Sequence, residues 1–278
     1  MTTSTQNLQT DRALKAKHRA IWASGSYQTI VNEIVAPLGP ILVAAAGVKP
    51  SDRVLDVAAG TGSASIPAAE IGARVVASDL TPELLEIGRR DAEARGISLD
   101  WQTADAEALP FRDNEFDVVL SCIGVMFAPH HRASAEELIR TCRPGGTIGL
   151  LSWTPEGFIG QMFATMKPYA PPPPPGAQPP PLWGNEQHVR ELLGDRVTNV
   201  EVQRQTLRVT RFDVPEDLRE HFKRNYGPTI ATYRNIADDP ERVASLDRAL
   251  ADLVRDYDRG VDKTVLEWEY LLVTARKR

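Results

Sequence analysis

The sequence predicts an α/β fold built around a mostly parallel sheet, and two observations lead to this fold class. From Arg53 onward, short apolar runs alternate with segments of helical composition, which is typical of βαβ units and a buried parallel sheet. The chain has 278 residues, of which 42% are hydrophobic and 25% charged, and this composition excludes wholesale disorder and a collagen-like structure. A chain of this size can bury the core of one enlarged domain that carries a cap.

The N-terminal part is predicted to be helical after a short tail. Residues 1–11 are rich in Thr, Gln and Asn and are expected to form a flexible tail. Residues 11–23 have a helical composition, and residues 30–35 place apolar side chains at the spacing of one helix face. A third short helix is expected over residues 40–47, with Pro in its first turn and Gly as its C-cap.

Five strands are expected before Trp153. They span residues 53–57, 74–78, 99–103, 116–121 and 147–152. Two intervening helices carry start signals: Thr81 is an N-cap followed by Pro, and Ser134 with Glu137 forms a capping box. Residues 12–153 are therefore expected to hold the N-terminal helices and the core of the sheet.

Beyond Trp153 the regular alternation stops. The proline-rich segment cannot pair in a sheet, so residues 154–196 are interpreted as a cap insertion, and its use as a ligand for an SH3-type domain is the alternative. Residues 197–278 are expected to complete the same sheet. In this part, strands are predicted at 200–209 and 266–274, helices at 215–226 and 240–257, and a helical cap segment over 213–260.

The charge and the cysteine content restrict the classes of partner. The net charge is −5 and the Lys and Arg residues form no cluster, so nucleic acid is not an expected partner. Cys122 and Cys142 lie in apolar surroundings and are expected to be reduced. The N-terminus has no apolar leader and the longest apolar runs are too short to cross a bilayer. We therefore expect no membrane insertion and a cytoplasmic location, while no motif indicates the oligomeric state.

A glycine-containing turn follows the first predicted strand. Gly60 and Gly62 stand between this strand and a helix of small residues, where the backbone turns sharply. Asp79 ends the second strand, where a carboxylate can accept hydrogen bonds from the ribose hydroxyls of an adenosine. The third glycine of a nicotinamide-dinucleotide motif would fall on Ser65, and no Lys of a P-loop follows the glycines. These differences disfavour a nicotinamide-dependent oxidoreductase and a P-loop nucleotidase.

Five ordered motifs carry a family resemblance: residues 54–62, Asp79, residues 105–111, residues 116–119 and residues 143–146. They resemble the motifs of class I S-adenosylmethionine-dependent methyltransferases. The sequence is most similar to the subgroup of ubiquinone and menaquinone biosynthesis enzymes with a methyltransferase type 11 domain, over about residues 48–153. The resemblance implies a Rossmann-like, seven-stranded methyltransferase sheet, mostly parallel with an antiparallel C-terminal strand. It also implies S-adenosylmethionine as the cofactor and S-adenosylhomocysteine as the product.

The same resemblance assigns residues to the parts of the cofactor. Gly60 and Gly62 would contact the methionine portion, Asp79 the ribose, and Asp105 with the Ala106 amide the adenine, against which Leu80 would pack. The candidate cofactor-binding set is completed by Tyr27, Asp56, Ala58 and Ser121.

Two of these positions need comment. Ala58 stands where the family usually has glycine, so the backbone there is expected to avoid positive φ. Similar methyltransferases cover the cofactor with an N-terminal helix and an aromatic residue, which makes Tyr27, and less so Trp22, a candidate contact. Core packing is the alternative for both aromatic side chains.

His130 and His131 are the candidate catalytic bases. They follow the fourth strand, where substrates approach in this fold, although solvated histidines in a polar loop are the alternative. His221, Tyr226 and Tyr233 are lesser candidates, and no metal site is predicted.

The expected reaction is in-line methyl transfer, by O- or C-methylation, to a small aromatic or lipophilic molecule. Both cap segments are expected to roof the active site, and the large apolar side chains there are the expected pocket walls. They are Met126, Phe127, Trp153, Phe158, Met162, Phe163, Tyr169, Trp183, Phe222 and Tyr226. A catalytically silent adenosyl-binding or interaction protein is the alternative function.

Overall fold

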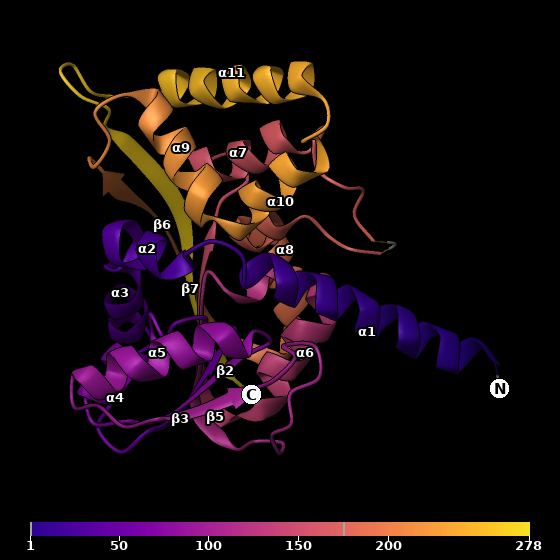
Figure 1. Ribbon diagram of the computed structural model, residues 1–278. Coiled ribbons are helices and arrows are strands. Elements are labelled where there is room, and N and C mark those ends of the chain that lie inside the picture. The colour runs from indigo at the N-terminus through magenta and orange to yellow at the C-terminus, as the bar shows by residue number, and fades with distance from the viewer. Residues whose placement is uncertain (1, 175) are drawn as a thin grey trace.

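A seven-stranded sheet forms the centre of the protein (Figure 1) in the computed structural model, which describes residues 2–174 and 176–278, with side chains from Asp11 onward. The strand order is β3-β2-β1-β4-β5-β7-β6, and β7 runs antiparallel to both of its neighbours. The strands are β1 (Arg53–Val57), β2 (Arg74–Asp79), β3 (Asp100–Thr103), β4 (Phe116–Cys122), β5 (Cys142–Trp153), β6 (Val197–Val209) and β7 (Leu266–Lys277). The predicted fold class is thereby confirmed, including the antiparallel C-terminal strand.

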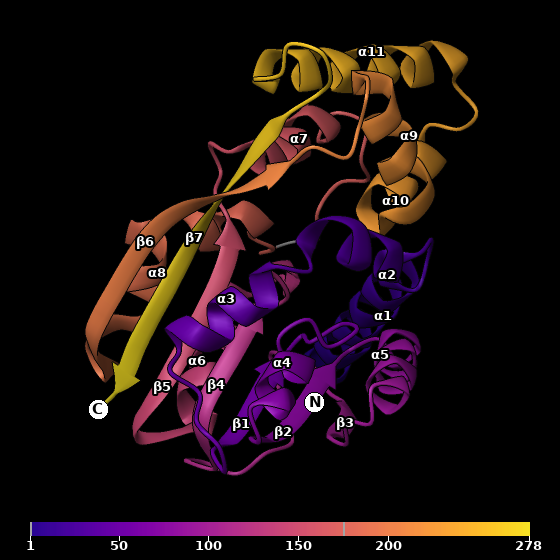
Figure 2. The ribbon, with the colours of Figure 1, turned by 90° about the vertical axis from the view of Figure 1, so that its left-hand side faces the viewer.

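Helices cover both faces of the parallel part of the sheet (Figures 1 and 2). Helices α3 (Leu38–Ala45), α4 (Ser65–Glu70) and α5 (Pro82–Ala94) lie on one side, and α6 (His131–Thr141) and α8 (Glu186–Leu193) lie on the other. Strands that are covered on both faces read as continuous apolar runs, and Val54, Leu55 and Val57 are fully buried in β1. This arrangement leaves the carboxyl ends of the parallel strands as the accessible edge for a ligand.

Helix α1 (Thr2–Trp22) begins the chain and is followed by α2 (Tyr27–Ile30) and a π-helix (Val31–Val35). Residues 2–11, which were expected to form a flexible tail, therefore have helical backbone, whereas Met1 lies outside the described residues. The reason is that residues 2–22 contain neither Gly nor Pro, so nothing interrupts the helix that the later residues favour.

The second half of the chain adds a layer of helices beyond the carboxyl ends of the strands (Figure 1). It consists of α7 (Phe158–Met166), α9 (Pro215–Asn225), α10 (Gly227–Asn235) and α11 (Pro240–Tyr257). Short 3-10 helices lie at Val125–Phe127, Pro180–Gly184 and Gly194–Arg196. Phe158 of α7 stacks on Trp268 of β7 with 5.7 Å between ring centroids, so aromatic contacts fix this layer to the sheet.

Two helix starts test the sequence signals. Helix α5 begins at Pro82 after Thr81, as predicted. Helix α6 begins at His131, so the predicted capping box is wrong. Ser134 lies one turn inside α6, where its Oγ donates to the carbonyl of His131 at 3.1 Å, and the Glu137 carboxylate accepts the Leu109 amide at 2.6 Å.

Among the described residues, no single helix has the length and apolarity needed to span a membrane; the bent pair Tyr27–Val35 and Leu38–Ala45 passes that test jointly, by length and composition only.

Candidate active site

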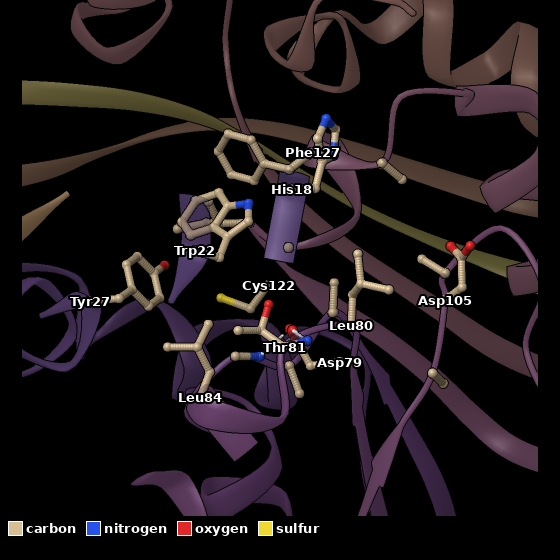
Figure 3. A pocket seen from close by; sticks show the side chains of 18 of the residues that line it. His18, Trp22, Tyr27, Asp79, Leu80, Thr81, Leu84, Asp105, Cys122 and Phe127 are labelled. Carbon is tan, nitrogen blue, oxygen red and sulfur yellow. Dashed lines mark hydrogen bonds between the residues drawn. The ribbon is translucent and has the colours of Figure 1, made fainter. Parts of the chain in front are cut away.

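A cavity of about 770 Å³, including its open mouth, lies at the carboxyl ends of β1, β2, β3 and β4 (Figure 3). Its wall is built from the turns that follow these strands and from one face of α1. Open α/β sheets bind ligands at this edge. The sequence had placed the site at the same edge.

Asp79 joins the turns after β1 and β2 on the floor of the cavity. Its Oδ2 accepts the Gly60 amide and its Oδ1 accepts the Thr81 amide, both at 2.8 Å. Burial raises the pKa of this carboxyl above its ordinary value, although the two amides act in the opposite direction. Each carboxylate oxygen can accept a second hydrogen bond, so Asp79 is fixed in position and can still accept hydroxyl groups from a ligand.

Ala58 has a φ of +54°, so the expectation that its backbone avoids positive φ is wrong. Gly124 packs so closely that a Cβ on it would lie 2.0 Å from the Ala58 carbonyl oxygen. Ile123, next to Gly124, also has a positive φ of 64°, which is rare for a β-branched residue. Ala58, Ile123 and Gly124 all line the cavity, and such strain is typical of functional sites.

Three predicted cofactor-binding residues shape the turns and do not line the cavity wall that the described residues form: Asp56, Gly62 and Ser121. Ser65 donates to Asp56 Oδ2 at 2.6 Å, and burial raises the pKa of Asp56 to about 7. Ser121 Oγ donates to the Val57 carbonyl at 2.7 Å and accepts the Val125 amide at 2.9 Å.

Gly62 makes room for Trp101, a residue that the sequence analysis missed. A Cβ on Gly62 would lie 2.7 Å from the indole ring of Trp101, and one on Gly88 of α5 would lie 2.6 Å from it. The indole therefore fills the gap between the turn and α5. In the sequence, Trp101 was visible only as a large aromatic residue in a predicted strand, and no motif indicated which residues it would contact.

One end of the cavity contains Leu80, Asp105 and Ala106, the residues predicted to hold adenine. Lys15 of α1 forms ion pairs there with Asp105 Oδ1, at 3.1 Å, and with Glu107. Because the Lys15 side chain is 11% exposed, this contact fixes α1 over the cavity. No motif in the sequence indicated Lys15.

Helix α1 roofs the cavity with one face. Lys15, His18 and Trp22 follow one another at the spacing of neighbouring helical turns, and all three line the wall. Trp22 also contacts Phe127, with 4.6 Å between ring centroids, and Tyr27, with 5.4 Å. Burial raises the pKa of Tyr27, so its phenol stays neutral.

The cap segments support this roof from outside, which corrects the expectation that they form it. Among the expected pocket walls, only Phe127 belongs to the cavity as the described residues outline it. Phe163 packs against Phe127 at 5.9 Å, and Tyr226 packs against Trp22 at 5.8 Å. The remaining members of that set, Met126, Trp153, Phe158, Met162, Tyr169, Trp183 and Phe222, also lie off the wall.

The candidate bases His130 and His131 lie outside the cavity wall of the described structure. His130 is held by Glu107, which accepts its amide at 2.7 Å and contacts its Nδ1 at 3.0 Å. His131 is fully buried, with its Nδ1 3.0 Å from Nε2 of His188. Burial and the neighbouring His188 lower the pKa of His131 to about 4. The position of neither residue supports the predicted role as a base.

Asp11, Glu107 and His130 bring possible metal-ligating atoms within 4.8 Å of one another. The Lys15 ammonium group is bonded to Glu107 and to Asp105, so this group already has a positive counter-charge. We therefore interpret it as an ion-pair network that fixes α1.

Several of the proteins that this chain resembles are methyltransferases, which is consistent with a cavity at this edge of the sheet. Residues 54–146 match the family model of a methyltransferase domain. The fold resembles that of phosphoethanolamine N-methyltransferase 2 of Haemonchus contortus, solved with S-adenosylhomocysteine, with a TM-score of 0.54, 16% identity and coverage of 86% of this chain and 52% of that one. The chain belongs to the class I S-adenosylmethionine-dependent methyltransferases.

Within this class, the chain is 54% identical over 268 residues to the uncharacterised protein Rv1405c of Mycobacterium tuberculosis, covering 96% of this chain and 97% of the relative. A demethylmenaquinone methyltransferase of Thermus thermophilus is 40% identical over 109 residues, which are 38% of this chain and 50% of that protein. The chain thus resembles quinone-biosynthesis enzymes in its core alone.

S-adenosylmethionine is the cofactor, and the cavity fits it. The buried Asp79 retains acceptor capacity for ribose hydroxyls, and Leu80 with Ala106 offers an apolar surface for adenine. The aromatic side chains of Trp22, Tyr27 and Phe127 in the cavity wall suit a positively charged sulfonium.

Proposed function

We propose that the enzyme methylates a small aromatic or lipophilic molecule, by attack of an oxygen or carbon atom. The observation that carries this proposal is the aromatic lining of the cavity. Trp22 and Phe127 lie across the cavity from Asp79 (Figure 3), and Tyr27 packs beside Gly60. Aromatic rings bind flat, apolar molecules through large contact areas at small entropic cost. The wall on this side has no carboxylate among the described residues, which disfavours a cationic amine as the acceptor.

The positions of these residues in the cavity support the cofactor-binding roles that the resemblance implies. Asp79 would accept the ribose hydroxyls, Asp105 and the Ala106 amide would bind adenine, and Leu80 would pack against the ring. The turn at Ala58 and Gly60 would hold the methionine portion. When bound, S-adenosylmethionine supplies a methyl group on a positive sulfur.

The residues of the chain position the reactants and exclude water. In-line transfer depends on orientation, which can contribute several kcal/mol to the barrier reduction. Helix α1 is held over the cavity at Lys15 and at Trp22 and covers one side of it. A dry cavity strengthens the attraction between a nucleophile and the sulfonium.

Calorimetric titration with S-adenosylmethionine and S-adenosylhomocysteine tests the cofactor part of this proposal, with Asp79→Ala expected to weaken both strongly. A screen with radiolabelled S-adenosylmethionine tests the acceptor part, using phenols, hydroquinones and lipophilic alcohols against amines and thiols. Transfer to the first group supports the proposal. Cofactor binding without transfer to any probe would instead indicate a catalytically silent adenosyl-binding protein.

A further inference from the structure

His18 is the one histidine of the chain that lines the cavity, as the described residues define it. It lies on α1 between Lys15 and Trp22, and its ring stands beside Phe127, across the cavity from Asp79 (Figure 3). If the ribose is bound at Asp79, an acceptor that enters on the side of α1 would lie between the cofactor and His18. This position differs from that of His130 and His131, which are bonded to Glu107 and His188.

The other titratable groups of the cavity are unsuited to accept a proton. Burial raises the pKa of Tyr27 and of Cys122, so both remain protonated. Asp79 is held by two backbone amides, and Asp105 is paired with Lys15. Among the side-chain hydrogen bonds of the described residues, none involves the His18 ring.

We propose that His18 is the general base of the reaction and that the acceptor is an aromatic molecule with an ionisable hydroxyl group. This inference rests on the proposed methyltransferase function. The hydroxyl oxygen gives an electron pair to the methyl carbon while the bond between carbon and sulfur breaks and its pair stays on sulfur. The hydroxyl proton moves to a ring nitrogen of His18, which then releases it to solvent.

The surroundings of His18 keep its ring neutral at physiological pH. Burial and the Lys15 ammonium on the same helix lower its pKa, and His130 acts in the same direction. Asp105 and Glu107, from the segment after β3, oppose these effects but do not reverse them. A neutral imidazole is the form that can accept a proton.

The acceptor class follows from combining the base with the roof. Phenols are poor nucleophiles when protonated, because their pKa is about 10. An aromatic hydroxyl compound would use both features, since its ring can pack against Trp22 and Phe127 while its hydroxyl faces His18. A plain lipophilic molecule would use the aromatic roof and leave His18 without a role.

The first test needs no acceptor and measures the pKa of His18 by NMR titration of the intact protein with labelled histidine. The signal is assigned with His18→Gln, and His221, which is outside the cavity wall, serves as the internal control. Because the sulfonium is positive, the pKa of His18 should be lower by about half a unit or more with S-adenosylmethionine than with S-adenosylhomocysteine. Equal values in the two complexes would overturn the proposal.

The second test compares kcat for phenol and for the more acidic 4-nitrophenol, which is largely ionised at about pH 8. We expect His18→Gln to lower kcat for phenol by about 100-fold and for 4-nitrophenol much less, because an ionised acceptor needs no base. The exposed Lys17→Gln on the same helix is the matched control. Equal losses for the two phenols, or no loss, would overturn the role of His18.

Calorimetry separates this inference from the function on which it rests. His18→Gln should bind S-adenosylhomocysteine as wild type does, since the residue is proposed to act on the acceptor. Failure of the wild type to bind either form of the cofactor would contradict the proposed function itself. Cofactor binding with transfer to lipophilic alcohols but not to phenols would leave that function standing and overturn the acceptor class.

Discussion

The Gly60 amide donates a hydrogen bond of 2.8 Å to Oδ2 of Asp79. This bond connects the turn after β1 with the end of β2, two neighbouring parallel strands. It orients the carboxylate before any ligand arrives, and it holds Gly60 at a φ of +57°. The cofactor cavity is therefore organised by the protein alone, and pre-organisation of this kind reduces the entropic cost of binding.

Asp79→Asn should weaken S-adenosylhomocysteine binding about 10- to 100-fold. The Asn side chain has one acceptor oxygen and one NH2 group, so a ribose hydroxyl that the carboxylate would accept loses its charged acceptor, at a cost of about 1.5–3 kcal/mol. Calorimetric titration measures the loss, and the exposed Asp238→Ala is the control. Wild-type affinity in Asp79→Asn would show that this carboxylate does not organise the site.

Ala58→Gly should stabilise the protein by about 0.5–1 kcal/mol. Ala58 has a φ of +54°, a conformation that costs a non-glycine residue about 1–2 kcal/mol, and the greater chain entropy of glycine offsets part of the gain. Urea denaturation gives the free energy of unfolding. Ala249→Gly, inside α11, should instead destabilise the protein by about 1 kcal/mol. If Ala58→Gly lowered the free energy of unfolding by a similar amount, the backbone of Ala58 would not be strained.

The sequence predicts the sheet and the floor of the cavity because both depend on short-range patterns. Each strand is an apolar run. Asp79 is the last residue of β2 and Asp105 comes two residues after the end of β3, so parallel pairing alone brings them to one edge. The positions of Lys15 and His18 depend on how α1 docks across that edge, which no local pattern encodes. Likewise, the positive φ of Ala58 depends on the close approach of Gly124 from another strand end.

His131 should make the stability of the protein sensitive to acid. Its pKa is about 4 in the folded protein, against an ordinary value of 6.5, so the unfolded chain binds its proton first as the pH falls. The stability contributed by the neutral, buried ring is complete above pH 6.5 and decreases between pH 6.5 and about 4. Urea denaturation at several pH values should show a loss on the order of 2 kcal/mol from this residue.

His131→Phe removes this titration; the titrating groups whose charges act on His131 are His188, Glu107 and His130. We expect the free energy of unfolding of the variant to fall less steeply with acid than that of the wild type. Parallel curves for the two proteins would show that His131 titrates normally in the folded state.

Asp56 should behave in the opposite sense, because burial raises its pKa to about 7 in the folded protein from an ordinary value of 3.8. The folded protein then binds the proton more tightly than the unfolded chain, so the stability that the protonated carboxyl contributes is complete below pH 3.8 and decreases as the pH rises to about 7. Asp56→Asn cannot ionise, and the wild type should therefore lose stability relative to this variant, by about 1 kcal/mol or more, between pH 5 and pH 8.

The Asp56 carboxyl is bonded to Ser65 and does not line the cavity of the described residues. S-adenosylhomocysteine should therefore bind Asp56→Asn with a smaller loss of affinity than Asp79→Asn. A larger loss at Asp56 would mean that this carboxyl contacts the cofactor directly, as the motif had suggested.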